Sequence, residues 1–250
     1  MCFRGTKVTK HPFEFQRNGP VVKGPGGHKP DFTLQITRPS QNSRYRAQTS
    51  HASRTSKMYT IDPVILVEAA KTSNFKKCKE IDLSSRKLGK IDMNTLRELQ
   101  NLKRLDVSDN SLSLEPFSVL PNLEDLDLSC NGIRKFDFTE SETLVHSGEA
   151  WVAMKKLNVA YNSLYNHITD IMLMPNLSWL NLSNNNISKL PPNMMHFANI
   201  KYLDLTGNKL NSQQAFFALA TVPLLETLIL DKNMIEQIPT IDFGFENLTN

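Results

Sequence analysis

The chain has 250 residues, of which 40% are apolar and 22% are charged, as in an ordinary globular protein of one large or two small domains. No run approaches the roughly 20 apolar residues of a membrane span, so no spanning helix is expected. The net charge of +4 hides an asymmetry between the two parts of the chain. Residues 1–60 carry 11 basic and 2 acidic groups, whereas the remaining 190 residues carry 18 basic and 23 acidic groups. The sequence therefore predicts a basic arm (+9) attached to an acidic body (−5).

The arm, residues 1–60, is dominated by Gly, Pro, Ser, Thr, Lys and Arg and has no sustained apolar period. Such a composition buries too little apolar surface to offset the entropy of ordering, so we expect a mostly disordered segment. Three roles are open to it. It is a plain linker, or a weak and salt-dependent binder of a polyanion such as nucleic acid or a microtubule, or a clamp that folds back on the acidic body.

Residues 61–77 are predicted to cap the body. Asp62 is placed to cap a helix whose first residue is Pro63, where the missing N–H of proline costs little. The sequence predicts a short helix from Pro63 to about Lys71.

Residues 78–250 repeat one pattern, LxxLxLxxNxL, whose seven copies occupy residues 78–88, 102–112, 123–133, 154–164, 177–187, 200–210 and 225–235. This pattern resembles the leucine-rich repeat. The resemblance implies an α/β solenoid, with a curved parallel β-sheet on the concave side and helical, 3-10 or irregular segments on the convex side. Leucines such as Leu126 and Leu128 should point inward, and the asparagine at the ninth position should satisfy backbone groups at the bend.

Two places depart from the repeat. The interval before the fourth copy is longer, which predicts an acidic loop within residues 136–150. This loop is either a functional addition or drift in a tolerant segment. Leu248 opens an eighth copy two residues before the end, and a solenoid needs a polar cap, so we expect a C-terminally truncated sequence.

The third position of each copy should face solvent from the concave sheet, and neighbouring copies should align these positions into a ladder. The ladder reads Glu80, Arg104, Asp125, Lys156, Trp179, Tyr202 and Thr227. Trp179 and Tyr202 would be adjacent, with Lys156 in reach of a cation–π contact. Exposed aromatic residues are frequent interface hot spots, which makes these three residues candidates for binding a protein. The alternative is that the two rings merely pack on each other, and that the charged positions form an ion-pair ladder.

Five further residues complete the candidate protein-binding site. The fifth and eighth positions should also face solvent from the concave sheet. The fifth position makes the first half of the sheet acidic, either as part of the repeat pattern or to attract basic groups of a partner, and the eighth position adds an acid and an aromatic. These residues are Asp82, Asp106, Asp109, Asp127 and Tyr161.

Enzymatic chemistry is not expected, because no nucleophile–base pair and no Cys/His spacing of a metal site is found. We expect no cofactor, no metal and no small-molecule substrate. The N-terminus, MCFRGTKVTKHP, lacks the apolar core of a signal peptide, which predicts an intracellular protein, cytoplasmic or nuclear.

Residues from about 75 to 241 also resemble the X-ray radiation resistance-associated protein family. The stretches LSLEPFSVLPNLEDLDLSCNGI (112–133), ISKLPPNM (187–194) and PLLETLILDKNMIEQIP (223–239) carry this resemblance. It implies an intracellular, non-enzymatic protein linked to the response to ionising radiation, with no catalytic residues to transfer. A second resemblance is to intracellular repeat proteins that regulate phosphatase-1 or serve cilia, although their repeats are usually more regular. The sequence thus predicts a protein–protein interaction scaffold.

Overall fold

The computed structural model describes residues 57–137, 148–166, 168–237, 239 and 245. In chain order its elements are β1 (Tyr59–Ile61), α1 (Pro63–Ala70), η1 (Phe75–Lys77), β2 (Glu80–Asp82), β3 (Leu88–Ile91), α2 (Met93–Arg97), β4 (Arg104–Asp106), η2 (Glu115–Val119), β5 (Asp125–Asp127), β6 (Lys156–Asn158), η3 (Thr169–Leu173), β7 (Trp179–Asn181), β8 (Tyr202–Asp204), α4 (Gln213–Leu219) and β9 (Thr227–Ile229).

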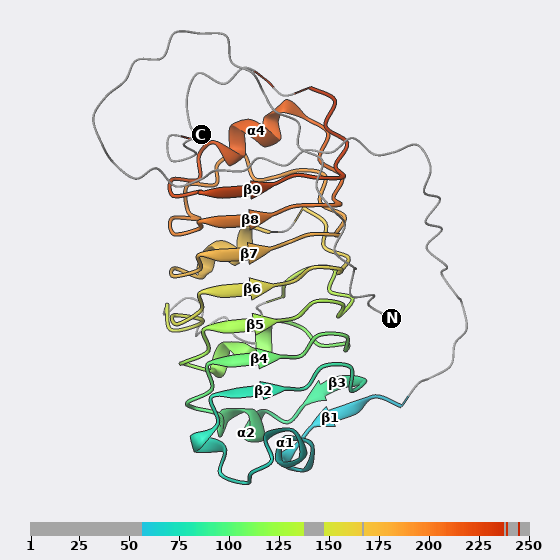
Figure 1. Cartoon of the computed structure of the whole chain (residues 1–250), viewed down its shortest axis with the longest axis vertical. Helices are drawn as coiled ribbons and strands as arrows, with labels where there is room; N and C mark the ends of the chain where they lie inside the picture. Colours follow the sequence, from blue (N-terminus) through green and yellow to red (C-terminus); the bar gives the residue numbers. More distant parts are fainter. Residues whose placement is uncertain (1–56, 138–147, 167, 238, 240–244, 246–250) are drawn as a thin grey trace, which may run out of the picture.

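The seven repeats form a single parallel sheet, as predicted. Its strand order is β2-β4-β5-β6-β7-β8-β9, so each repeat lies beside the next, and Figure 1 shows the strands stacked like rungs. Each strand pairs its third, fourth and fifth repeat positions with the same positions of its neighbour. Because each strand has only three residues, the alternation of sides leaves the fourth position inward and the third and fifth outward.

The core is a continuous column of inward leucines. Leu126 and Leu128, predicted to point inward, are fully buried, as are Leu180 and Leu182 two repeats further along. The convex side is closed by short helices and 3-10 turns. Among them is α4, which lies within the segment NSQQAFFALATV and buries Phe216.

The ninth-position asparagines behave as the pattern predicts. Six of them (Asn110, Asn131, Asn162, Asn185, Asn208 and Asn233) are buried. Asn185 is typical: its side-chain carbonyl accepts a hydrogen bond from the Leu164 N–H of the preceding repeat at 2.9 Å, and its amide donates to the carbonyls of Val159 and Leu182. Each asparagine therefore joins two successive repeats through otherwise unpaired backbone groups.

A second, outer series of asparagines stands immediately before the first apolar residue of the repeat, which is leucine in three copies and isoleucine in one. Its members Asn101, Asn122, Asn176 and Asn199 each donate a side-chain N–H to a backbone carbonyl of the preceding repeat, at 2.7–2.8 Å. These residues are exposed, and the sequence analysis did not identify them. The signal was the recurring Asn-Leu pair at the start of the copies.

The N-terminal cap contains the predicted helix. Asp62 accepts a hydrogen bond from the Ile65 N–H at 2.9 Å, and α1 ends at Ala70. The ninth position of the first repeat, Arg86, forms a 3.0 Å ion pair with Glu68 of α1 and so connects the cap to the repeats. The predicted arm boundary at residue 60 is wrong in detail, because it falls inside β1, which pairs with β3.

The two departures from the repeat lie partly or wholly outside the described residues. Residues 138–147 of the predicted loop are not described, but its ends, Phe136 and Ala150, are buried in the core. The segment of residues 136–150, within which the insertion was predicted, thus begins and ends at core residues. The eighth copy around Leu248 and most of the basic arm, residues 1–56, also lie outside the described residues.

Candidate protein-binding face

The third-position ladder exists as predicted. Lys156 of β6 pairs in register with Trp179 of β7, which pairs in turn with Tyr202 of β8. The two aromatic rings are stacked, with centroids 5.1 Å apart and an angle of 9° between the ring planes. Both side chains are half-buried, so the stack still presents surface to solvent on the concave sheet. Partial burial raises the pKa of the Tyr202 phenol, and the negative charge of the nearby Asp204 carboxylate raises it further. The phenol is therefore neutral at ordinary pH.

Lys156 does not take the role predicted for it. Within the described part of the chain, a cation–π contact joins Lys57 to Tyr59, and none joins Lys156 to Trp179. The other neighbour of Lys156 in register is Asp125 of β5, whose pKa is raised by burial although the positive charge of Lys156 opposes that rise. Lys156 thus stands at the boundary between the charged and the aromatic parts of the ladder.

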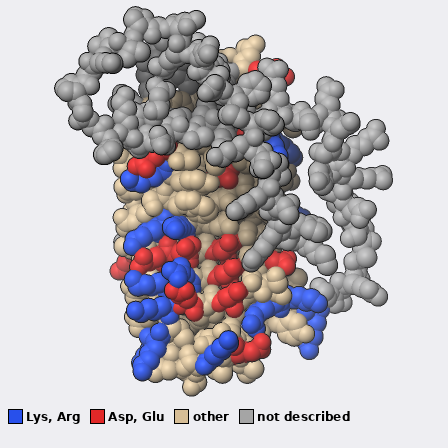
Figure 2. Space-filling view, in the orientation of Figure 1, with Lys and Arg blue, Asp and Glu red and all other residues tan. Residues whose placement is uncertain are grey.

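The first part of the ladder is charged. Glu80 and Arg104 form an ion pair between β2 and β4. Around them lies an open hollow of about 450 Å³, which we call the acidic hollow, lined by Glu80, Ile81, Asp82, Arg104, Leu105, Asp106, Asp125 and Asp127. Five carboxylates and one guanidinium therefore share this surface. Figure 2 shows these acidic residues gathered over the lower strands.

The predicted fifth-position acids Asp82, Asp106 and Asp127 all line the acidic hollow and also have a structural role. In each, one carboxylate oxygen accepts a hydrogen bond from the N–H two residues later, at 2.8–2.9 Å, which stabilises the turn that leaves the strand. Asn158 and Asn181, at the same position of later repeats, accept the same bond at 3.1 and 2.9 Å. The turn therefore needs an oxygen acceptor and does not need a negative charge.

Asp109 and Tyr161 lie on the turn beyond the strands and not on the sheet itself. The expectation that eighth positions face solvent from the sheet was wrong in this respect, because the strands end at the fifth position. Both residues have left-handed backbone, with φ of 54°, and Asp109 accepts a hydrogen bond from the Ser85 hydroxyl at 2.9 Å. Tyr161 is 55% exposed. These two residues border the concave face at the ends of its strands.

Sequence reasoning missed a second charged row, at the second repeat position. Glu124 lies between Lys103 and Lys155 and forms ion pairs with both at 2.7 Å. Hydrogen bonds from Lys103 and then Lys155 lower the pKa of Glu124 to about 2. Lys201 and Glu226 form a similar pair at 2.7 Å. The alternation of Lys and Glu at this position was visible in the sequence.

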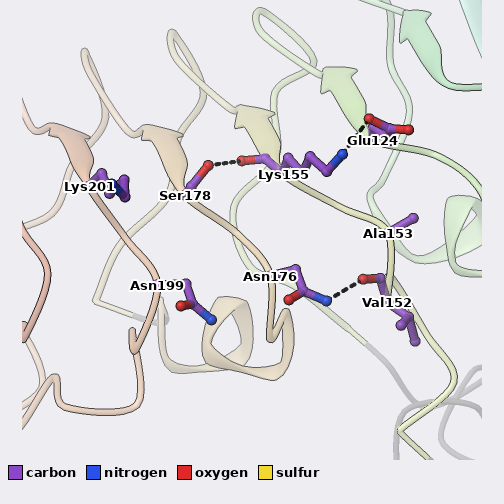
Figure 3. Close-up of a pocket in the computed structure, with 8 residues that line it drawn as sticks. All are labelled: Glu124, Val152, Ala153, Lys155, Asn176, Ser178, Asn199 and Lys201. Carbon is purple, nitrogen blue, oxygen red and sulfur yellow. Dashed lines mark hydrogen bonds and ion pairs between the residues drawn. The ribbon is translucent and has the colours of Figure 1, made fainter.

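Along this row is a second shallow hollow, of about 480 Å³, shown in Figure 3. Lys155 points toward Glu124, and Ser178 donates its hydroxyl to the Lys155 carbonyl at 3.2 Å. Asn176 donates to the Val152 carbonyl. Figure 3 marks these hydrogen bonds and the ion pair by dashed lines. Because these polar groups bind one another, they favour a structural role for this edge of the sheet.

Among the residues that the structure describes, no group of three His, Cys, Asp or Glu side chains could hold a metal ion. None of the described helices is long and apolar enough to cross a membrane.

Two family models match the chain. The model described as "Leucine rich repeat" matches residues 153–210, and that described as "Leucine Rich repeats (2 copies)" matches residues 100–140. The chain therefore has the leucine-rich-repeat fold. The matched segments include the strands that carry Asp106, Asp127, Lys156, Trp179 and Tyr202. Both matches are to repeats, which are typically non-catalytic.

Known proteins share this repeat at modest identity. X-ray radiation resistance-associated protein 1 of Mus musculus is 29% identical over 178 residues, which cover 64% of this chain and 22% of that protein. Osteomodulin of Bos taurus is 28% identical over 176 residues, covering 68% of this chain and 39% of that protein. Among solved structures, a crystal structure of a TLR13–ssRNA13 complex matches 68% of this chain and 23% of that chain, with a TM-score of 0.51 and 28% identity. The chain spans a minor part of each relative and is too distant from each to be assigned to one of them.

Proposed function

We propose that the chain is a non-enzymatic scaffold that binds a partner protein on its concave face. Leucine-rich-repeat domains commonly bind proteins, and one observation carries the proposal for this chain. The Trp179–Tyr202 stack is a large, half-exposed aromatic surface fixed on a rigid sheet. Such residues lose little side-chain entropy on binding and are enriched among interface hot spots. The competing interpretation, a pair that only stabilises the sheet, predicts loss of stability without loss of binding when the ring is removed.

The test compares partner capture with stability. Partners are identified by proximity labelling around the full chain, and their affinity is then measured with purified wild-type and Trp179→Ala protein. We expect Trp179→Ala to weaken binding by about 2 kcal/mol, or roughly 30-fold. Thr227→Ala is the matched control, because Thr227 occupies the same ladder on β9. Unchanged affinity in a folded Trp179→Ala protein contradicts the proposal.

The cellular setting is part of the same proposal. The name of the similar mouse protein, X-ray radiation resistance-associated protein 1, supports a part in the response to ionising radiation. The proposed location, cytoplasmic or nuclear, rests on the N-terminal sequence, which lacks the apolar core of a signal peptide. A tagged chain would locate it, and survival of irradiated cells with and without the protein would test the link. Equal survival contradicts the link and leaves the binding proposal intact.

Polyanion binding by the arm is a second candidate, favoured by the +9 charge of residues 1–60. The acidic hollow repels phosphates, so any nucleic acid would have to contact the arm. A shift assay of the full chain on mixed-sequence DNA should show binding at low salt that falls steeply with added salt. A variant whose arm carries Gln in place of Lys and Arg should not bind, and absence of binding by the wild type at low salt excludes this role.

A further inference from the structure

The concave face has two chemically different halves on the same ladders. Over β2, β4 and β5 the outward residues form the acidic hollow. Over β7, β8 and β9 the third positions are Trp179, Tyr202 and Thr227, and the fifth positions include Asn181 and Ile229. Figure 2 shows charged residues dense over the lower strands and a less charged area above them. A partner that covers this face meets negative charge at one end and an aromatic surface at the other.

The negative charge is not required by the fold. Asn158 and Asn181 make the same turn hydrogen bond that Asp82, Asp106 and Asp127 make, so a neutral amide is sufficient. The carboxylates also disfavour one another. Burial raises the pKa of the Asp125 carboxyl, and the negative charges of Asp127 and Asp106 raise it further. The positive charges of Lys156 and Arg104 oppose this rise without cancelling it. Negative charge that these turns do not need is expected where a ligand uses it.

We propose that the concave face binds a basic segment of a partner protein, whose Arg or Lys side chains enter the acidic hollow while an apolar side chain rests on the Trp179–Tyr202 stack. This inference rests on the proposed function and specifies the chemistry of the partner. Charge complementarity selects the basic segment, because five carboxylates are balanced by a single arginine in the hollow. The half-exposed stack, an independent feature, selects the apolar side chain.

The strand spacing sets the distance between the two contacts. Neighbouring strands lie about 4.8 Å apart, so β4 or β5 is about 12–17 Å from the middle of the β7–β8 pair. An extended chain advances about 3.3 Å per residue, which places the apolar residue about four or five residues from the basic ones. The segment runs across the strands, along the axis of the solenoid.

In the experiment, synthetic peptides are titrated into the full chain. The salt concentration is about 50 mM, because contacts between charges are only weakly screened there. The probe carries three arginines, a spacer of four Gly or Ser residues, and one leucine. Control peptides replace the arginines by glutamate, replace the leucine by serine, or shorten the spacer to one residue. Tryptophan fluorescence reports binding, because the chain has two tryptophans and Trp151 is only 2% exposed, so a change at the surface arises from Trp179.

The decisive variant is Asp82→Asn with Asp106→Asn and Asp127→Asn. It keeps the turn hydrogen bonds and removes three charges, and it gives up the bond that the Asn158 amide donates to the second oxygen of Asp127 at 2.8 Å. We expect the probe to bind at least about tenfold more weakly to the folded variant. Asp204→Asn is the matched control, since Asp204 occupies the same position outside the hollow and makes the same bond at 2.8 Å. Tyr202→Ala should weaken binding of the probe that carries leucine and leave binding of the serine peptide unchanged.

Three results overturn the inference. The triple variant binds the probe as tightly as wild type, or the glutamate peptide binds as well as the arginine peptide, or the probe binds only after the arm's Lys and Arg are changed to Gln. The last result identifies the chain's own arm as the occupant of the hollow. If the triple variant loses the probe while Trp179→Ala retains every cellular partner, the aromatic anchor of the proposed function fails and the basic chemistry stands.

Discussion

At the scale of single residues, the inner asparagines connect the repeats more strongly than their small size suggests. In an Asn185→Ala protein, the Leu164 N–H and the carbonyls of Val159 and Leu182 lose their side-chain partner. Each buried unpaired group of this kind costs about 1–3 kcal/mol, so we expect the free energy of unfolding to fall by at least about 3 kcal/mol, measured by urea denaturation. The outer, exposed Asn176 makes a single such bond, and Asn176→Ala should cost less than about 1 kcal/mol. Equal losses in the two variants would contradict this account.

Tyr161 has a left-handed backbone conformation, which a bulky residue such as tyrosine disfavours. The eighth repeat position has positive φ in all seven copies. Asp109, Asn184 and Gly207 tolerate left-handed backbone, whereas the remaining copies hold Ser85, Cys130, Tyr161 and Lys232, of which tyrosine is the bulkiest. Tyr161 has no such tolerance and is largely exposed. We expect Tyr161→Asn to raise the free energy of unfolding by about 0.5–1 kcal/mol in thermal or urea denaturation. Asn184→Tyr should lower it by a similar amount, and a Tyr161→Asn protein less stable than wild type would show that side-chain contacts of Tyr161 outweigh the strain.

At the scale of the element, the row of second-position charges makes stability depend on pH. Glu124 has its pKa lowered to about 2, mainly by Lys103 and then Lys155, from an ordinary value near 4.5. A carboxyl with a lowered folded-state pKa stabilises the fold above its unfolded pKa, and this contribution is lost as the pH falls from about 4.5 to about 2. Wild type should therefore lose stability relative to Glu124→Gln across this window, measured as the difference in melting temperature. Because the pair is exposed, 0.5 M salt should shrink the difference, and a difference constant with pH would contradict the prediction.

The strands show which features the sequence could predict. The period of the pattern determines which residues share a ladder, so the Trp179–Tyr202 contact and the buried asparagines followed from spacing alone. Spacing does not determine where a three-residue strand ends, and Asp109 and Tyr161 were therefore placed on the sheet and not on its turn. Nor does it reveal long-range pairing of short segments, so β1 and its partner β3 were missed. The partner of Lys156 depended on side-chain geometry, which the pattern leaves open.

At the scale of the whole molecule, the solenoid is a one-dimensional stack. In the seven-stranded sheet each strand pairs with the strand or strands beside it (Figure 1). The hydrophobic core continues from Leu66 of the cap to Leu230 of the last repeat. At the N-terminal end, α1 buries Leu66 against the first repeat, while Leu228 of β9 is buried near the other end. In such a stack, stability is approximately a sum of repeat and nearest-neighbour contributions, so damage at one end should be felt most at that end.

Hydrogen exchange of the backbone amides tests this directly. Leu66→Ala removes about 2–5 kcal/mol of buried contact beneath the cap, and exchange should accelerate most in β2 and β4 and least in β8. Leu228→Ala should produce the reverse gradient, with β8 most affected and β2 least. Mass spectrometry of peptides that contain each strand measures both gradients at one pH and temperature. Uniform acceleration in all strands for either variant would show that the solenoid unfolds as a single cooperative unit. Each end would then stabilise the distant strands as strongly as the strands beside it.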